Sequence, residues 1–210
     1  MRQVVAFKRV LVHMATSSHP LPPPGPVGAL SLYRTSDPDD ALINSLLPPN
    51  RLPHARRCLA RGDVAHLAFN GDDLAGWVWT TEVAHRDRLS GVIIQLDEGE
   101  CYWYDMWVHA DQRRSGAGRF MLDTVSAWIR EQGIGRSYAY TFPETPAIHH
   151  MIKPYGFHQV HQFWVVQALD RVGWQIPRSD RPRGGPCTKR RPARPGDHDT
   201  SSGSESSSLS

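Results

Sequence analysis

The sequence has no run of about 18 consecutive apolar residues, and its cysteine content and net charge are low. The missing apolar run argues against a membrane-spanning helix. Cys58, Cys101 and Cys187 are an odd number without close pairs, so we expect no disulfide framework and a reducing, cytoplasmic location. A net charge of +3 does not favour a nucleic-acid-binding core.

Lysine is also scarce, with none between Lys8 and Lys153. A P-loop needs a lysine directly after its second glycine, so this long stretch cannot contain one. Phosphate binding in the middle of the chain would have to rely on main-chain groups and on arginine.

The two ends of the chain differ in composition from its middle. Residues 1–27 hold two short apolar runs and a proline-rich linker, and we interpret them as an N-terminal extension, either an amphipathic helix or a disordered lead. Residues 177–210 are rich in Arg, Pro, Gly and Ser, so we expect a disordered tail. Residues 28–176 remain as one domain.

The hydrophobic pattern of residues 28–176 switches between the periods of strands and helices. We expect strands near residues 29–34, 64–69, 74–81, 92–96, 101–108, 137–142 and 160–168. We expect helices at residues 41–47, 53–61, 147–152, and from the glycines after residue 115 to Gly133.

The most informative segment joins the strand that ends at Val108 to the helix that follows. It reads Arg-x-x-Gly-x-Gly, from Arg113 to Gly118. Glycine lets main-chain N–H groups approach a ligand closely, and a helix N-terminus adds unpaired N–H donors and the positive end of its dipole. This order predicts a phosphate or pyrophosphate site. A dinucleotide fingerprint would need a further glycine where Met121 stands.

The same order of strand, polar link, Arg-x-x-Gly-x-Gly and helix resembles motif A of the GNAT acyltransferase superfamily. A second segment resembles motif B of that family, with a strand at 137–142, a short helix and Gly156-Phe157. Together the two segments cover residues 64–168. The resemblance implies an α/β fold of the α+β type, with a central mixed, mostly antiparallel sheet flanked by helices. It also implies acetyl-CoA or another acyl-CoA as co-substrate.

The resemblance assigns cofactor-binding roles to two groups of residues. Main-chain groups of Met106, Trp107 and Val108 are expected to hold the pantetheine arm and to polarise the thioester carbonyl. The loop expected to bind the pyrophosphate consists of Arg113, Arg114, Ser115, Gly116, Ala117, Gly118 and Arg119.

Acyl transfer to an amine needs a group that takes the amine proton and a group that protonates the departing thiolate. Many GNAT members use a tyrosine four residues before the glycine of Gly-Phe, but Ile152 stands there. Tyr155 is the substitute candidate, and packing at the helix end is its alternative role.

The candidate bases are Asp105, Glu82 and Glu100, although GNAT members often work with no dedicated base. Strand alternation puts Asp105 on the same face as Trp103 and Trp107. Partial desolvation among tryptophans would raise the pKa of that carboxyl and suit it to amine deprotonation.

Histidines and tryptophans offer two further patterns. His149, His150, His158 and His161 do not converge at strand and helix spacing, so we expect no metal site. The tryptophans at 77, 79, 103 and 107 are first of all sheet-face residues, and secondarily an aromatic pocket for a cationic or apolar acceptor.

We therefore expect an N-acyltransferase that moves an acetyl or other acyl group from acyl-CoA to a primary amine of a small molecule or a protein. We expect no nucleic-acid or membrane partner, and a monomer or homodimer. Two alternatives stay open: a CoA-binding sensor or structural protein of the same fold without catalysis, and a phosphate- or nucleotide-binding module without acyl chemistry.

Overall fold

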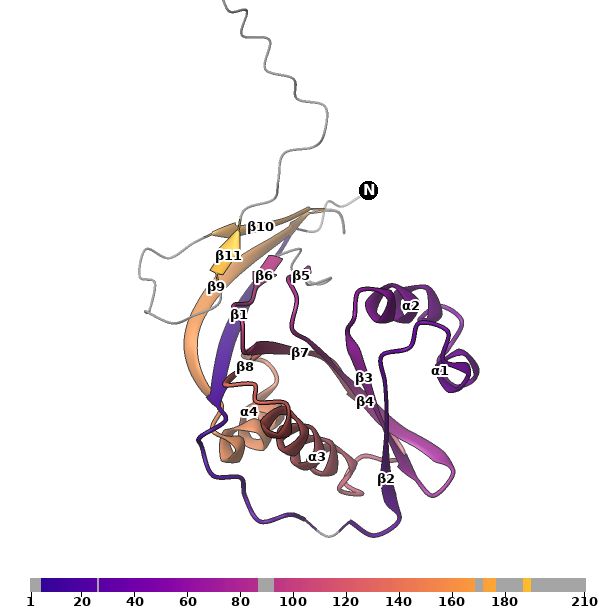
Figure 1. Ribbon diagram of the computed structural model, residues 1–210. Helices are drawn as coiled ribbons and strands as arrows, with labels where there is room; N and C mark the ends of the chain where they lie inside the picture. Colours follow the sequence, from indigo (N-terminus) through magenta and orange to yellow (C-terminus); the bar gives the residue numbers. More distant parts are fainter. Residues whose placement is uncertain (1–4, 26, 87–92, 169–171, 177–186, 190–210) are drawn as a thin grey trace, which may run out of the picture.

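The computed structural model describes residues 5–25, 27–86, 93–168, 172–176 and 187–189 (Figure 1). Its elements are β1 (Val5–Thr16), β2 (Leu30–Thr35), α1 (Ala41–Leu46), α2 (Leu52–Ala60), β3 (Val64–Asn70), β4 (Asp73–Thr81), β5 (His85–Arg86), β6 (Ile93–Gln95), β7 (Glu100–Val108), α3 (Ala117–Glu131), β8 (Arg136–Thr141), α4 (Pro146–Ile152), η1 (Lys153–Tyr155), β9 (His158–Ala168), β10 (Val172–Ile176) and β11 (Cys187–Lys189).

Eight strands form one sheet in the order β10-β9-β1-β8-β7-β4-β3-β2. Only β7 and β8 pair in parallel, and the other neighbours are antiparallel. A second, small sheet has the order β11-β6-β5. The mixed, mostly antiparallel sheet confirms the predicted fold class.

Helices cover both faces of the large sheet (Figure 1). On one face, Ile43 of α1 and Cys58 and Leu59 of α2 pack on the inward residues of the strands. On the other face, α3 contributes one apolar stripe, and α4 adds Ile152; the buried residues of that stripe are Met121, Leu122, Val125 and Ile129. The helical spacing of this stripe explains why the sequence predicted α3 correctly.

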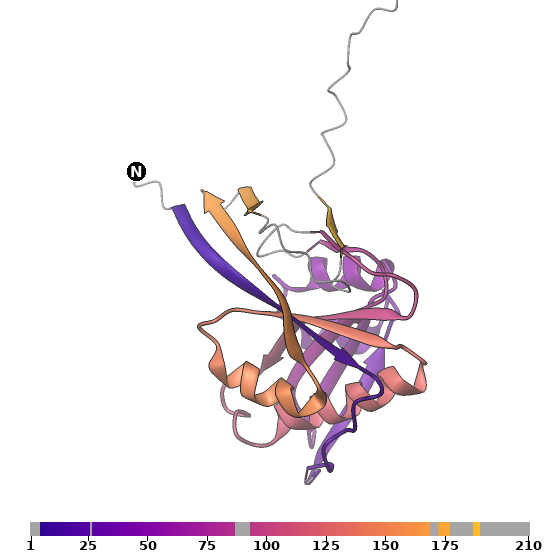
Figure 2. The same ribbon diagram turned by 90° about the vertical axis from the view of Figure 1, so that its left-hand side faces the viewer.

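The first strand corrects the expectation for the N-terminus. Residues 1–27 were expected to be an extension with a helix or a disordered lead, but β1 lies inside the sheet between β8 and β9. Figure 2 shows β1 in indigo next to β9 in orange. Val10 and Val12 are buried on one face, and Leu11 and His13 on the other. The domain therefore begins at least as early as Val5, not at residue 28.

The expected C-terminal tail is corrected at one place. Cys187–Lys189 forms β11 and pairs with β6 around Ile94. Residues 177–186 and 190–210, the rest of that tail, lie outside the described residues. None of the described helices is long and apolar enough to cross a membrane.

Candidate functional site

The large sheet forks where its two parallel strands separate. β7 and β8 pair from Glu100 and Arg136 to Trp103 and Ala139, and no further. β7 continues to Val108 and stays paired with β4 on its other edge. Among the described residues, no strand pairs with the edge of Met106–Val108 that faces β8. That edge offers main-chain donors and acceptors to a ligand.

A bulge in β7 produces this change of direction. Tyr104 pairs with Trp79 and Trp107 pairs with Trp77, so Asp105 and Met106 together stand opposite Val78. Asp105 has a φ of 47°, in the left-handed region that non-glycine residues seldom adopt. An extra residue in one strand of a pair reverses the face of every side chain after it.

The bulge corrects the expected surroundings of Asp105. Trp103 packs with Phe157 on the α3 and α4 face, whereas Trp107 stacks on Trp77 on the opposite face at 6.1 Å between ring centroids. Asp105 therefore does not lie between Trp103 and Trp107. Its carboxylate pairs with Arg51, just before α2, at 3.1 Å.

The glycine turn lies beside the fork at the start of α3. Gly116 has a φ of 95° and is the N-cap residue of the helix, and the first intrahelical bond runs from the Phe120 N–H to the Gly116 carbonyl. The N–H groups of Gly118 and Arg119 thus have no acceptor within the helix. Ser115 accepts the N–H of Ala117 at 3.3 Å.

Gly118 brings α3 and α4 close together. A Cβ at this position would lie 3.3 Å from the Met151 sulfur of α4 and 3.6 Å from Cγ2 of Val108. Gly76 of β4, which the sequence analysis missed, is more constrained, because a Cβ there would overlap the Trp107 carbonyl oxygen. Only a glycine lets β4 approach the bulged strand this closely.

The three arginines of the turn do not all face the same point. Arg113 and Arg114 are exposed, and the Arg113 guanidinium lies 5.5 Å from the centre of the Trp107 ring. Arg119 instead donates to the Pro23 carbonyl at 2.6 Å and lies 3.8 Å from Asp123. Arg113 and Arg114 are therefore the exposed cations of the turn, although Nε of Arg113 also donates to the Val108 carbonyl at 3.5 Å. Arg119 holds the linker against α3.

The remaining candidates for proton transfer lie in different environments. Glu82 is exposed at the end of β4. Glu100 is buried, pairs with Arg136 at 2.9 Å and accepts the Tyr138 hydroxyl at 2.9 Å, which is a structural arrangement. Tyr155 is buried and donates to Asp123 at 2.5 Å. Burial, and then Asp123, raise the pKa of Tyr155, so the hydroxyl holds its proton tightly.

Sequence reasoning missed a buried polar network on the α2 side of the bulge. The Tyr104 hydroxyl donates to Asp63, Asp63 pairs with Arg61, and Arg61 lies 2.9 Å from Nδ1 of His85. Burial, and then Arg61, lower the pKa of His85 to about 4. Alternating patterns give no signal for such a network, because its members come from separate strands and loops.

Metal ligands do not gather in the described part of the chain, which contains no group of three or more His, Cys, Asp or Glu suited to a metal ion. Instead, Nε2 of His13 and Nε2 of His149 both lie within hydrogen-bond distance of the Thr141 hydroxyl, at 2.9 and 2.7 Å.

Solved structures share the overall fold of this mixed sheet and its flanking helices. A Drosophila protein aligns with 80% of this chain and 53% of its own at 12% identity and a TM-score of 0.55. The glucosamine N-acetyltransferase region of a fungal multi-domain beta-N-acetylglucosaminidase aligns with 78% of this chain and 21% of its own, at 12% identity and a TM-score of 0.56.

A functionally unknown conserved protein from Staphylococcus epidermidis aligns with 77% of this chain and 62% of its own, at 8% identity and a TM-score of 0.51. At such identities the likeness shows the fold alone, and this chain spans less than two thirds of each of these three proteins. Residues 29–157 match the acetyltransferase (GNAT) family, and the chain belongs to it. No curated protein matches the chain.

Proposed function

We propose that this protein is an N-acyltransferase that transfers an acetyl or other acyl group from acyl-CoA to a primary amine. The observation that carries the proposal is the position of the glycine turn of α3 directly beside the open edge of Met106–Val108. Family membership supports the same class of reaction.

The residues beside the fork fit a CoA molecule. The left-handed Gly116 and the absent side chain of Gly118 leave the N–H groups at the start of α3 accessible, as a pyrophosphate requires. Arg113 and Arg114 add two cations at the same turn. The unpaired edge of Met106–Val108 suits the amides of a pantetheine arm. When bound, acyl-CoA supplies the activated thioester.

The chain itself has to orient the acceptor and take its proton. Asp105 lies at the bulge where the fork opens, paired with Arg51, whose guanidinium lies 6.0 Å from the centre of the Trp77 ring. This position supports a role for its carboxylate in accepting a proton from an incoming amine, directly or through water. Glu82 is the second candidate base. Tyr155 is retained as the candidate acid, although its hydroxyl is already bonded to Asp123.

The acceptor and the setting of the reaction belong to the same proposal. We infer a small-molecule or protein amine as acceptor, a monomer or homodimer, and a cytoplasmic location. The reduced, buried Cys58 and Cys101 support a reducing compartment.

Calorimetry on the full chain tests the cofactor assignment. Acetyl-CoA is expected to bind, and ATP and NAD are not. Gly118→Val should weaken acetyl-CoA binding strongly, because its methyl groups would enter the fork beside Met151 and Val108. Gly118→Ala is the matched control, since a single Cβ would be in tight contact with the flexible Met151 side chain alone and in ordinary van der Waals contact with Val108 and Met106.

Unchanged acetyl-CoA affinity in a folded Gly118→Val variant contradicts the assignment. A release assay for free CoA thiol with a panel of amines then tests catalysis. Binding of acetyl-CoA with no thiol release for any amine would favour a sensor of the same fold.

A further inference from the structure

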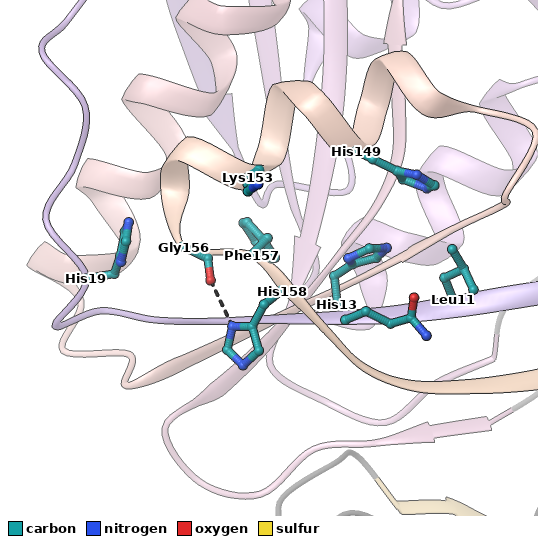
Figure 3. Close-up of a pocket in the computed structure, with 9 residues that line it drawn as sticks. Leu11, His13, His19, His149, Lys153, Gly156, Phe157 and His158 are labelled. Carbon is teal, nitrogen blue, oxygen red and sulfur yellow. Dashed lines mark hydrogen bonds between the residues drawn. The ribbon is translucent and has the colours of Figure 1, made fainter.

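A cavity of about 550 Å³ lies against α4 and η1 on one side and against β1 and the start of β9 on the other (Figure 3). It has five titratable side chains in its wall, and all five are basic: His13, His19, His149, Lys153 and His158. In Figure 3 the rings of His13 and His149 face each other, and His19 lies at the opposite end of the cavity.

No acidic side chain offsets the basic side chains that line this cavity. In the part of the chain that the structure describes, none of the five basic side chains forms an ion pair. A site lined by one sign of charge raises the local concentration of ligands of the opposite sign.

Polar groups around the cavity form hydrogen bonds with three of its histidines. The Thr141 hydroxyl lies between Nε2 of His13 and Nε2 of His149, at 2.9 and 2.7 Å. His158 donates from Nδ1 to the Gly156 carbonyl at 3.1 Å, which leaves its Nε2 for another partner. The Lys153 ammonium is exposed. The wall therefore combines one point charge with imidazoles that become donors on protonation.

The cavity is separate from the proposed CoA site. Met151 of α4 faces Gly118 of α3, whereas His149 of α4 and Lys153 of η1, one helical turn apart, face the cavity. A ligand in this cavity would contact the face of α4 that carries His149, and the opposite face, which carries Met151, packs beside the fork.

We propose that this cavity binds an organic anion that carries a phosphate group, held by Lys153, His149 and His158. The volume exceeds what a bare ion needs and lies in the range of small-molecule sites. Lysine and imidazole are single-point donors suited to the oxygens of a phosphate, and the cavity has no arginine to grip a carboxylate with two parallel bonds.

Binding of such an anion is linked to protonation. Burial, and then His149 and His158, lower the pKa of His13 to about 4, so His13 is neutral near neutral pH. His19 and Lys153 are the other basic groups that face the same space, and the Thr141 hydroxyl lies within hydrogen-bond distance of both His13 and His149. A bound dianion would supply the missing negative charge and favour the imidazolium forms.

Calorimetric titration of phenyl phosphate into the full chain tests the proposal, with saturating acetyl-CoA present and absent. Phenyl phosphate is expected to bind in both conditions. His149→Gln and Lys153→Gln should each weaken binding about tenfold or more, because each removes one charge-assisted hydrogen bond. His150→Gln, an exposed neighbour on the same helix outside the cavity wall, should leave it unchanged.

Four results would overturn the proposal: no binding of phenyl phosphate, wild-type affinity in both cavity variants, displacement by acetyl-CoA, or binding of benzoate as tight as that of phenyl phosphate. Displacement would assign the phosphate to the turn of α3 instead. Because Lys153 is exposed, Lys153→Gln keeps the test valid even if His149→Gln does not fold.

Discussion

Asp105 combines a strained backbone with a carboxylate at the mouth of the fork. A left-handed non-glycine residue costs on the order of 1–3 kcal/mol, and such residues cluster at functional sites. Asparagine tolerates the same backbone conformation, so Asp105→Asn removes the charge while keeping the bulge.

Asp105→Asn should lower turnover by about 100-fold or more if the carboxylate takes the amine proton. Acyl-CoA affinity should change little, and the deficit should shrink at high pH, where more amine is already neutral. Steady-state kinetics across pH measure this, with Asp73→Asn, an exposed acid at the start of β4, as control. If Asp105→Asn and the wild-type protein have the same turnover at every pH, Asp105 is structural. The amine proton would then be taken by Glu82, a water chain or solvent.

The buried hydrogen bond of Tyr104 should contribute to the free energy of unfolding. Its buried hydroxyl donates to Asp63, whose side chain is 0% exposed. Tyr104→Phe leaves that carboxylate short of one donor and should cost about 1–3 kcal/mol of unfolding free energy. Tyr33→Phe removes the hydroxyl bond to Asp40 from an exposed ring, where water replaces the donor, so its loss should be smaller. Urea unfolding compares them, and equal losses would contradict the prediction.

At the scale of elements, β1 supports the sheet from both sides. Its backbone pairs with β8 from Leu11 to Thr16 and with β9 from Val5 to Met14. A chain that starts at Ser17 should therefore lose its cooperative thermal transition, because β8 and the β9–β10 hairpin lose their shared partner. Removing residues 190–210, which are nearly all small or polar, should leave the melting temperature almost unchanged. Circular dichroism measures both, and a cooperative melt without β1 would refute this.

The sequence predicted the elements whose signals are local. Helical spacing revealed α3, alternation revealed β3 and β4, and the glycine turn followed from Arg-x-x-Gly-x-Gly. β1 was missed because it is buried on both faces over residues 10–13, so it shows a continuous apolar run instead of alternation.

The candidate site could be predicted only in part, for a related reason. The turn at Gly116 lies where the motif put it, but the face of Asp105 depended on the bulge opposite Val78. A bulge is a property of two paired strands, and the pattern of one strand does not reveal it. The contacts of Asp105 with Arg51 and of Arg119 with Pro23 likewise join residues far apart in the chain.

For the whole molecule, three buried histidines determine a dependence of stability on pH. Burial lowers the pKa of His66 to about 3 and those of His13 and His85 to about 4, from an ordinary value of 6.5. Between about pH 4 and 6.5 these three histidines therefore bind more protons in the unfolded chain than in the folded chain. Stability from these groups is complete above pH 6.5 and falls as the pH drops toward 4.

Each such histidine contributes a slope of up to about 1.4 kcal/mol per pH unit in this range. Urea unfolding at several pH values measures the total slope, and His66→Gln should reduce it by the share of one proton. His150→Gln, on the exposed face of α4, should leave it unchanged. A stability that rises on acidification through this range would contradict the prediction.

The position of β1 also determines when the sheet can close during synthesis. Arg9 and its partner Gln162 lie 153 residues apart, and His13 and Thr141 lie 128 apart. At a translation rate of about 5–20 residues per second, the strands that pair with β1 are synthesised on the order of ten seconds after it. Contacts of such long range also slow folding itself. We therefore expect the apolar residues 10–12, which are buried in the folded chain, to lack their sheet partners during that time of synthesis.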